Sequence, residues 1–217
     1  MGNQKTKSVK LNMVMNALLS MSSVLFPLIT FPYVSRILLP VGTGRVAFAT
    51  AVVTYFAMFA QLGIPTYGIR ACARVRDDKE ALSRVVQELV FINVCMSVLV
   101  YIVFGICLFA VPKFREEHSL LMVIGVTIIL NALGVEWLYK ALEQYTYITV
   151  RSVIFKVVAL IGTFLLVRGS GDCLQYGFLT ILATSASNIL NFINLRKYIY
   201  LKPVGNYNFR QHMKMIW

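Results

Sequence analysis

The chain has 217 residues, of which 58% are hydrophobic and 14% are charged, and it carries a net charge of +12. A soluble domain normally has about 25% charged residues, so this composition excludes an ordinary water-soluble fold and indicates that lipid surrounds most side chains. The basic residues lie between long apolar runs and form no basic stripe with interleaved aromatic residues, which argues against nucleic acid as a partner.

Six stretches are long and apolar enough to cross the hydrocarbon core, which takes about 20 mostly apolar residues. They cover residues 11–31, 44–64, 85–111, 119–138, 148–167 and 174–195. The connectors between them are short and rich in turn-forming or charged residues, so no soluble domain fits between the helices. The sequence therefore predicts an all-α integral membrane protein. We expect residues 1–200 to form a six-transmembrane-helix bundle and residues 201–217 to form a cytoplasmic linker.

The distribution of Lys and Arg predicts the orientation of this bundle. The two tails and the second and fourth connectors contain fifteen of these cations, and the other three connectors contain five. The first set is Lys5, Lys7, Lys10, Arg70, Arg74, Arg76, Lys79, Arg84, Lys140, Arg151, Arg196, Lys197, Lys202, Arg210 and Lys214, and the second is Arg36, Arg45, Lys113, Arg115 and Arg168. Because cytoplasmic loops carry the excess of Lys and Arg, both termini are predicted to be cytoplasmic.

Polar side chains recur on one face of four stretches. In the first stretch they fall within about 80° of one another at 100° per residue. The residues expected to face a shared polar space are Asn12, Asn16, Ser20, Ser23, Thr50, Thr54, Gln61, Ser152, Thr184, Ser187 and Asn191. A single stripe of this kind favours dry helix packing, with side-chain hydrogen bonds between helices. Four stripes in one bundle shift the interpretation towards a water-filled cavity.

Lys156 is the ionisable residue that lies deepest in its stretch, about a turn and a half beyond Arg151. A charge near the bilayer centre costs at least about 2.5–3.5 kcal/mol on insertion scales, so it faces a partner or water. The alternative is that its long stem reaches the interface. Glu136 is a candidate partner, although it is also spaced to pair with Lys140 on its own helix.

Four further residues mark the predicted outer end of the first two stretches. Arg36 and Arg45 flank the connector between these stretches and are expected at the outer mouth. Pro27 and Pro32 interrupt the first stretch near the same end. Prolines at such positions form either a hinge or a static kink, and both readings remain open.

Motifs for catalysis or nucleotide binding do not occur in the sequence. It contains no GxxxxGK[ST] loop, no HExxH and no GxSxG. The four cysteines, Cys72, Cys95, Cys107 and Cys173, are scattered and form no CxxC pair. We therefore expect no enzymatic activity, no cofactor and no metal site.

Several blocks of sequence resemble the bacterial polysaccharide-transport family, the flippases for O-antigen, capsule and other undecaprenyl-pyrophosphate-linked oligosaccharides. The blocks are FPYVSR at 31–36, LGIPTYGIR at 62–70, RDDK at 76–79, GVEW at 134–137 with Glu143, Tyr147 and RS at 151–152, and NILNFINLRKY at 188–198. The sequence differs from the family pattern at Ala71, where Glu is usual, and at Lys140, where Gln is usual. No family role is therefore carried over to these two positions.

This resemblance implies one lobe of a larger transporter. Members of the family have two six-helix lobes around a central cavity and are about twice this length, so the chain resembles the N-terminal lobe, ending in the linker to a seventh helix. The implied activity is movement of a polyprenyl-pyrophosphate-linked glycan from the inner to the outer leaflet of the bacterial cytoplasmic membrane. The implied partners are this lipid-linked glycan, the bilayer, a second lobe and other polysaccharide-assembly proteins.

The resemblance also suggests roles for the polar residues. Lys156, Arg36 and Arg45 would compensate the charge of the pyrophosphate, and amides and hydroxyls would pair with the sugar. Two alternatives remain open: half of a cation-coupled multidrug exporter, and a structural membrane protein without transport. An exporter of cations needs buried carboxylates, for which the stretches offer Glu136 and Glu88.

Overall fold

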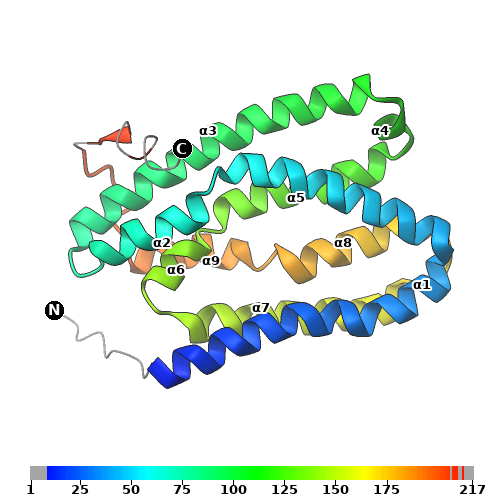
Figure 1. Cartoon of the computed structure of the whole chain (residues 1–217), viewed down its shortest axis with the longest axis horizontal. Coiled ribbons are helices and arrows are strands. Elements are labelled where there is room, and N and C mark those ends of the chain that lie inside the picture. The colour runs from blue at the N-terminus through cyan, green and yellow to red at the C-terminus, as the bar shows by residue number, and fades with distance from the viewer. Residues whose placement is uncertain (1–8, 206, 210–211, 213–217) are drawn as a thin grey trace.

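The computed structural model describes residues 9–205, 207–209 and 212, and within them it contains helices and no β-strand (Figure 1). The helices are α1 (Val9–Gln61), α2 (Ile64–Arg74), α3 (Lys79–Ala110), α4 (Pro112–Glu116), α5 (His118–Leu133), α6 (Glu136–Ala141), α7 (Tyr145–Leu166), α8 (Cys173–Thr184), α9 (Asn188–Asn194) and a 3₁₀ turn (Leu195–Lys197). Lys5, Lys7 and the linker residues 206, 210, 211 and 213–217 lie outside the described part of the chain.

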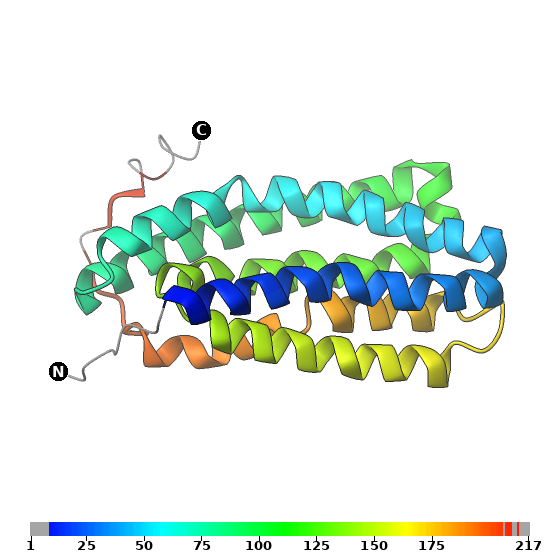
Figure 2. The same cartoon turned by 60° about the horizontal axis from the view of Figure 1, so that its bottom comes forward.

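Five helical stretches in the described residues are long and apolar enough to cross a membrane. They are Val9–Arg74, Lys79–Ala110, His118–Ala141, Tyr145–Leu166 and Cys173–Lys197. The first of them is folded in two at Leu39, so that the two halves of α1 run in opposite directions and diverge from the turn (Figures 1 and 2). The predicted all-α membrane fold is thereby confirmed, and the count of six holds when the halves of α1 are counted separately.

A single residue makes the reversal within α1. Leu39 has φ 60° and ψ 171°, and the residues on both sides of it are helical. Pro40 explains the position, because proline disfavours the α conformation in the residue before it and suits the first position of a new helix. The sequence predicted a connector from 32 to 43, and the structure has helix across almost all of that range. Pro27 and Pro32 likewise lie inside continuous helix.

Different helix ends and turns lie at the two ends of the bundle. The start of α1, the α2–α3 turn, α6 and the 3₁₀ turn lie at one end, which we call the Val9 end (Figure 2). The turn at Leu39, α4 and the α7–α8 connection lie at the other, the Leu39 end. A cluster of buried apolar side chains holds each end together. Val53, Phe104 and Leu121 belong to the cluster at the Leu39 end, and Leu89 and Ile148 to that at the Val9 end.

Two predicted helices are broken in the structure. The stretch predicted as 119–138 divides into α5 and α6 at Val135, whose φ of 34° and ψ of 30° are left-handed. The stretch predicted as 174–195 divides into α8 and α9 after Thr184. There the N–H groups of Ser185 and Ala186 both donate to the carbonyl of Ile181. Breaks of this kind free backbone carbonyls, which must find other donors in a membrane.

Candidate functional site: a polar pocket beside two helix breaks

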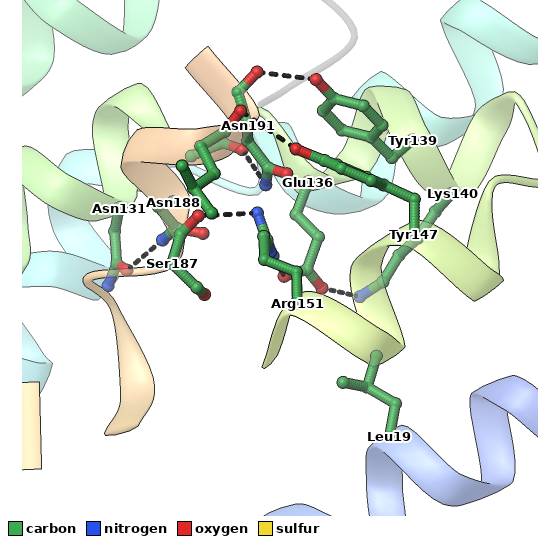
Figure 3. A network of polar contacts seen from close by, with 12 residues as sticks. Leu19, Asn131, Glu136, Tyr139, Lys140, Tyr147, Arg151, Ser187, Asn188 and Asn191 are labelled. Carbon is green, nitrogen blue, oxygen red and sulfur yellow. Dashed lines mark hydrogen bonds and ion pairs between the residues drawn. The ribbon is translucent and has the colours of Figure 1, made fainter. Parts of the chain in front are cut away.

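The two helix breaks lie against each other, and amide side chains join them (Figure 3). Asn191 Nδ2 donates to the carbonyl oxygen of Gly134 at 2.6 Å, and Asn188 Nδ2 donates to Asn131 Oδ1 at 3.2 Å. Tyr139 donates its hydroxyl to the carbonyl of Asn191 at 2.6 Å. These side chains supply partners to backbone carbonyls at and beside the breaks, which explains how the lost helical bonds are replaced in an apolar surrounding.

Arg151 of α7 is the charged residue at the centre of this network (Figure 3). Its side chain is 4% exposed, Nη1 donates to the carbonyl of Ser187 at 2.9 Å, and Nη2 lies 3.6 Å from Glu136 Oε2. Its Nε has no hydrogen-bond partner among the described residues. A buried guanidinium is stable only when it is paired and hydrogen-bonded, so Arg151 depends on Glu136 and on the α8–α9 break.

Glu136 also pairs with Lys140, one turn further along α6. Glu136 Oε1 lies 2.8 Å from Lys140 Nζ, and both side chains are about one-third exposed. Of the two partners weighed for Glu136 in the sequence, the structure therefore has Lys140 rather than Lys156. With Arg151 on its other oxygen, this carboxylate connects α6 to α7 and lies between two cations.

A pocket of about 250 Å³ opens beside this network, between the ends of α1 and α2, the middle of α3, the α5–α6 break and α9. Trp137 and Pro65 form part of its wall. Its polar lining residues are Gln61, Asn93, Asn131, Glu136, Lys140 and Asn188. Asn93 is 3% exposed; its Nδ2 donates to the carbonyl of Ala132, and its Oδ1 has no partner among the described residues. We call this the polar pocket; it offers several amides, one carboxylate and one ammonium group.

Lys156 lies elsewhere, between α7 and the first half of α1. Its Nζ donates to the hydroxyls of Ser22 and Ser23, at 2.8 Å each. The lysine is half-buried and joins the two helices through neutral partners. Thr149 of α7 also donates to the carbonyl of Met15, so polar contacts hold these two helices together at several levels.

The arginines expected at the outer mouth lie at the Leu39 end. Arg45 is exposed, and its Nε donates to both oxygens of Glu117 at 2.7 and 2.9 Å. Arg36 is exposed on the other half of α1. Neither arginine lines the polar pocket.

The structure divides the predicted stripes among several places. Gln61 lines the polar pocket, Ser187 and Asn191 belong to the helix-break network, and Ser23 contacts Lys156. Asn12 is buried with Oδ1 lacking a partner among the described residues. The remaining residues of the stripes are exposed or partly exposed: Asn16, Ser20, Thr50, Thr54, Ser152 and Thr184. The polar residues of the first and sixth predicted stretches thus belong to different clusters of polar side chains within this chain.

Close packing at the α5–α6 break leaves no room for a side chain at position 134. A Cβ at this position would lie 2.8 Å from the amide of Asn188, whereas Gly105 in α3 has open space around it. Gly134→Ala should therefore lower the free energy of unfolding by about 1–3 kcal/mol, and Gly105→Ala should not lower it. The double variant Gly134→Ala with Asn188→Ala should lose less unfolding free energy than the two single variants together, because the smaller side chain at 188 removes the clash. Full additivity in thermal unfolding would contradict this packing.

The fold and site define a multi-pass helical membrane protein with a polar pocket inside the bundle, and comparison with known proteins agrees with this class. The family model described as "Polysaccharide biosynthesis protein" matches residues 9–216, and the chain belongs to this family. It is similar to a "Putative O-antigen transporter" of Escherichia coli (strain K12), with 23% identity over 210 residues, 97% of this chain and 50% of the relative.

A second relative is a "Putative O-antigen transporter" of Shigella dysenteriae, with 25% identity over 195 residues, covering 88% of this chain and 48% of the relative. The chain therefore spans about half the length of the curated relatives it matches. No solved structure was found to match it.

Proposed function

We propose that this chain is one lobe of a flippase that moves an undecaprenyl-pyrophosphate-linked oligosaccharide from the inner to the outer leaflet for surface polysaccharide synthesis. The observation that carries the proposal is the polar pocket beside two broken helices inside an apolar bundle. Secondary transporters place substrate sites near the bilayer midplane, at discontinuous helices. Membership of the polysaccharide biosynthesis family and the names of the two relatives support the same substrate class.

The lining of the pocket fits a sugar better than a cationic drug. An amide can both donate to and accept from sugar hydroxyls, and Asn93 Oδ1 has no partner among the described residues. The carboxylates that an exporter of cations would need are engaged. Glu136 pairs with Lys140, and Glu88 lies 2.6 Å from His212 Nε2. In this proposal Lys156, whose partners in the structure are neutral hydroxyls, supplies positive charge for the pyrophosphate as it leaves the headgroup region.

Substrate binding tests the proposal without requiring a second lobe. The purified chain in lipid nanodiscs should bind a short-chain analogue of the pyrophosphate-linked oligosaccharide, and Asn93→Leu should weaken that binding about tenfold or more, because a buried amide that pairs with a hydroxyl is lost. Phe91→Leu, on the exposed side of the same helix, is the matched control and should bind normally. Equal affinity of both variants would remove the pocket from the substrate path.

The proposed transport direction requires the Val9 end to be cytoplasmic. The basic residues of the α2–α3 turn, of α6 and of the segment after α9 lie at that end, as the positive-inside rule expects for a cytoplasmic face. Reporter fusions at Lys79, Glu143 and Lys202 should therefore read cytoplasmic, and fusions at Glu116 and Gly171 should read outside. A periplasmic signal at Lys79 would reverse the orientation and, with it, the proposed entry side.

A further inference from the structure

An apolar groove of about 460 Å³ lies on the bundle between α3 and α5, directly beyond the polar pocket. It is lined by Val94, Ser97, Val98 and Ile102 of α3 and by Ile129 and Leu133 of α5. Its volume is in the range of sites that hold a drug-sized ligand. Tyr101 also lines it, and its hydroxyl is already engaged by the carbonyl of Gly125, so the ring presents an apolar surface.

The groove and the polar pocket share a border. Asn93 lines the pocket and Val94 lines the groove, and on α5 Asn131 lines the pocket and Ala132 the groove. The hydrogen bond from Asn93 to the carbonyl of Ala132, 3.1 Å long, crosses between the two helices at this border. On both helices, consecutive residues therefore line the polar pocket and the apolar groove.

Two buried polar atoms at this border lack a partner within the described residues. They are Asn93 Oδ1 and Ser97 Oγ, one helical turn apart on α3, in side chains that are 3% and 6% exposed. Other buried hydroxyls in the bundle donate to backbone carbonyls: Ser83 of α3 to that of Lys79, and Thr163 of α7 to that of Ala159. Ser97 does not, and a buried hydroxyl without a partner carries a desolvation cost that a hydrogen bond to a ligand would remove.

The order of the two cavities matches the order of a membrane lipid. From Val94 to Ile102 the groove runs about 12 Å along α3, at 1.5 Å per residue, from the middle of the helix away from the Val9 end. A lipid of the leaflet at the Val9 end has its headgroup towards that end and its chain towards the middle. Lys140 also lines the pocket, where its ammonium group pairs with Glu136.

We infer that the polar pocket and the α3–α5 groove together form one binding site for an amphiphile, with the phosphate-linked sugar in the pocket and the first isoprene units of a polyprenyl chain in the groove. The inference rests on the proposed function and deepens it by assigning a path to the chain on this lobe. A phospholipid is the less fitting occupant, because the amides of the pocket pair with sugar hydroxyls. Asn93 accepts from a hydroxyl, and Ser97 donates to a phosphate oxygen.

Photo-crosslinking tests this site with the full chain in nanodiscs. The probe is a polyprenyl phosphate that carries one sugar and a diazirine near the phosphate end of the chain. It should label Val94–Ile102 or Ile129–Leu133, as mapped by mass spectrometry. Val98→Trp should fill the groove and reduce labelling about tenfold, since excluding two buried methylene groups weakens apolar binding by that much. Leu99→Trp is the matched control: Val98 and Leu99 are both 55% exposed, and only Val98 lines the groove.

Each outcome decides between defined alternatives. Equal labelling of the two Trp variants would overturn the inference. Competition by an equal mole fraction of phosphatidylglycerol would also overturn it, because the groove would then accept any bilayer lipid. If the short-chain analogue binds the pocket while Val98→Trp leaves labelling unchanged, the proposed function stands and the groove assignment fails. If the groove is labelled specifically while the short-chain analogue does not bind, the sugar assignment of the pocket fails instead.

Discussion

Glu136→Gln is expected to lower the free energy of unfolding by about 3 kcal/mol, the low end for breaking a buried ion pair because the carboxylate is itself about one-third exposed. The substitution keeps the size and much of the hydrogen bonding of the side chain, but it leaves the guanidinium of Arg151 buried without a counter-charge. The Arg151 side chain is 4% exposed and its Nε already lacks a partner among the described residues, so solvent cannot fully compensate for the lost carboxylate. Denaturant titration of the purified chain in bicelles measures this cost.

Two further variants separate this explanation from a general effect of losing a carboxylate. Glu136→Gln combined with Arg151→Met should recover most of the stability, because the uncompensated charge is then absent. Glu143→Gln is the matched control, since its 2.9 Å pair with Arg76 is more than 40% exposed on both sides and should be worth less than about 1 kcal/mol. If the double variant proves less stable than Glu136→Gln alone, Arg151 contributes packing that outweighs its charge.

Lys156→Met is expected to reduce transport about 10–100-fold, corresponding to the loss of one charge-assisted hydrogen bond of about 1.5–3 kcal/mol. An anionic pyrophosphate needs a compensating cation in an apolar surrounding, and Met keeps the stem while removing the charge. Lys156→Arg should retain much of the activity. The readout is surface polysaccharide in a flippase-deficient strain that expresses this chain together with a C-terminal lobe. The chain without that lobe should be inactive, because alternating access needs two repeats that move against each other.

The control for this prediction is a double alanine variant at the two serines that accept hydrogen bonds from Lys156. Ser22 and Ser23 accept its hydrogen bonds, so replacing both with alanine leaves the charge in place and removes the bond between α7 and α1. If the double alanine variant loses as much transport as Lys156→Met, the lysine acts by joining two helices. Full activity of Lys156→Met would show that its charge has no part in transport.

The membrane fold could be predicted from the sequence because lipid exposure leaves a direct mark on composition. A span must be apolar over about 20 residues whatever its neighbours are, so the stretches at 85–111 and 148–167 correspond closely to α3 and α7. The turn at Leu39 was less visible. A one-residue reversal has no loop composition of its own, and Pro40 is its main sequence signal.

The helix breaks and the pocket beside them could not be predicted, because distant residues determine them. Val135 adopts its left-handed conformation where Asn188 and Asn191, more than 50 residues later, pack on Gly134. In the sequence Gly134 is one glycine in an apolar stretch. The amides of Asn93, Asn131 and Asn188 lie one on each of three helices and form no stripe, so only the packing of those helices brings them together.

Arg151 shows a different limit of the sequence. It was counted among the cations that orient the chain, and its position near the start of a span fits that role equally well. In the structure it is buried, and the carbonyl of Ser187 is its partner. A basic residue near a helix end can either orient the chain in the membrane or form a buried contact. In Arg151 the second role depends on the α8–α9 break, which the sequence did not reveal.

The turn at Leu39 also bears on how the chain enters the membrane during synthesis. One residue makes the reversal, so no connecting loop separates the two halves of α1. They are expected to partition into lipid together, as a helical hairpin. Arg36 and Arg45, on either side of the turn, would then cross the membrane in a single step, which makes the tip of this hairpin the costliest part of the chain to deliver.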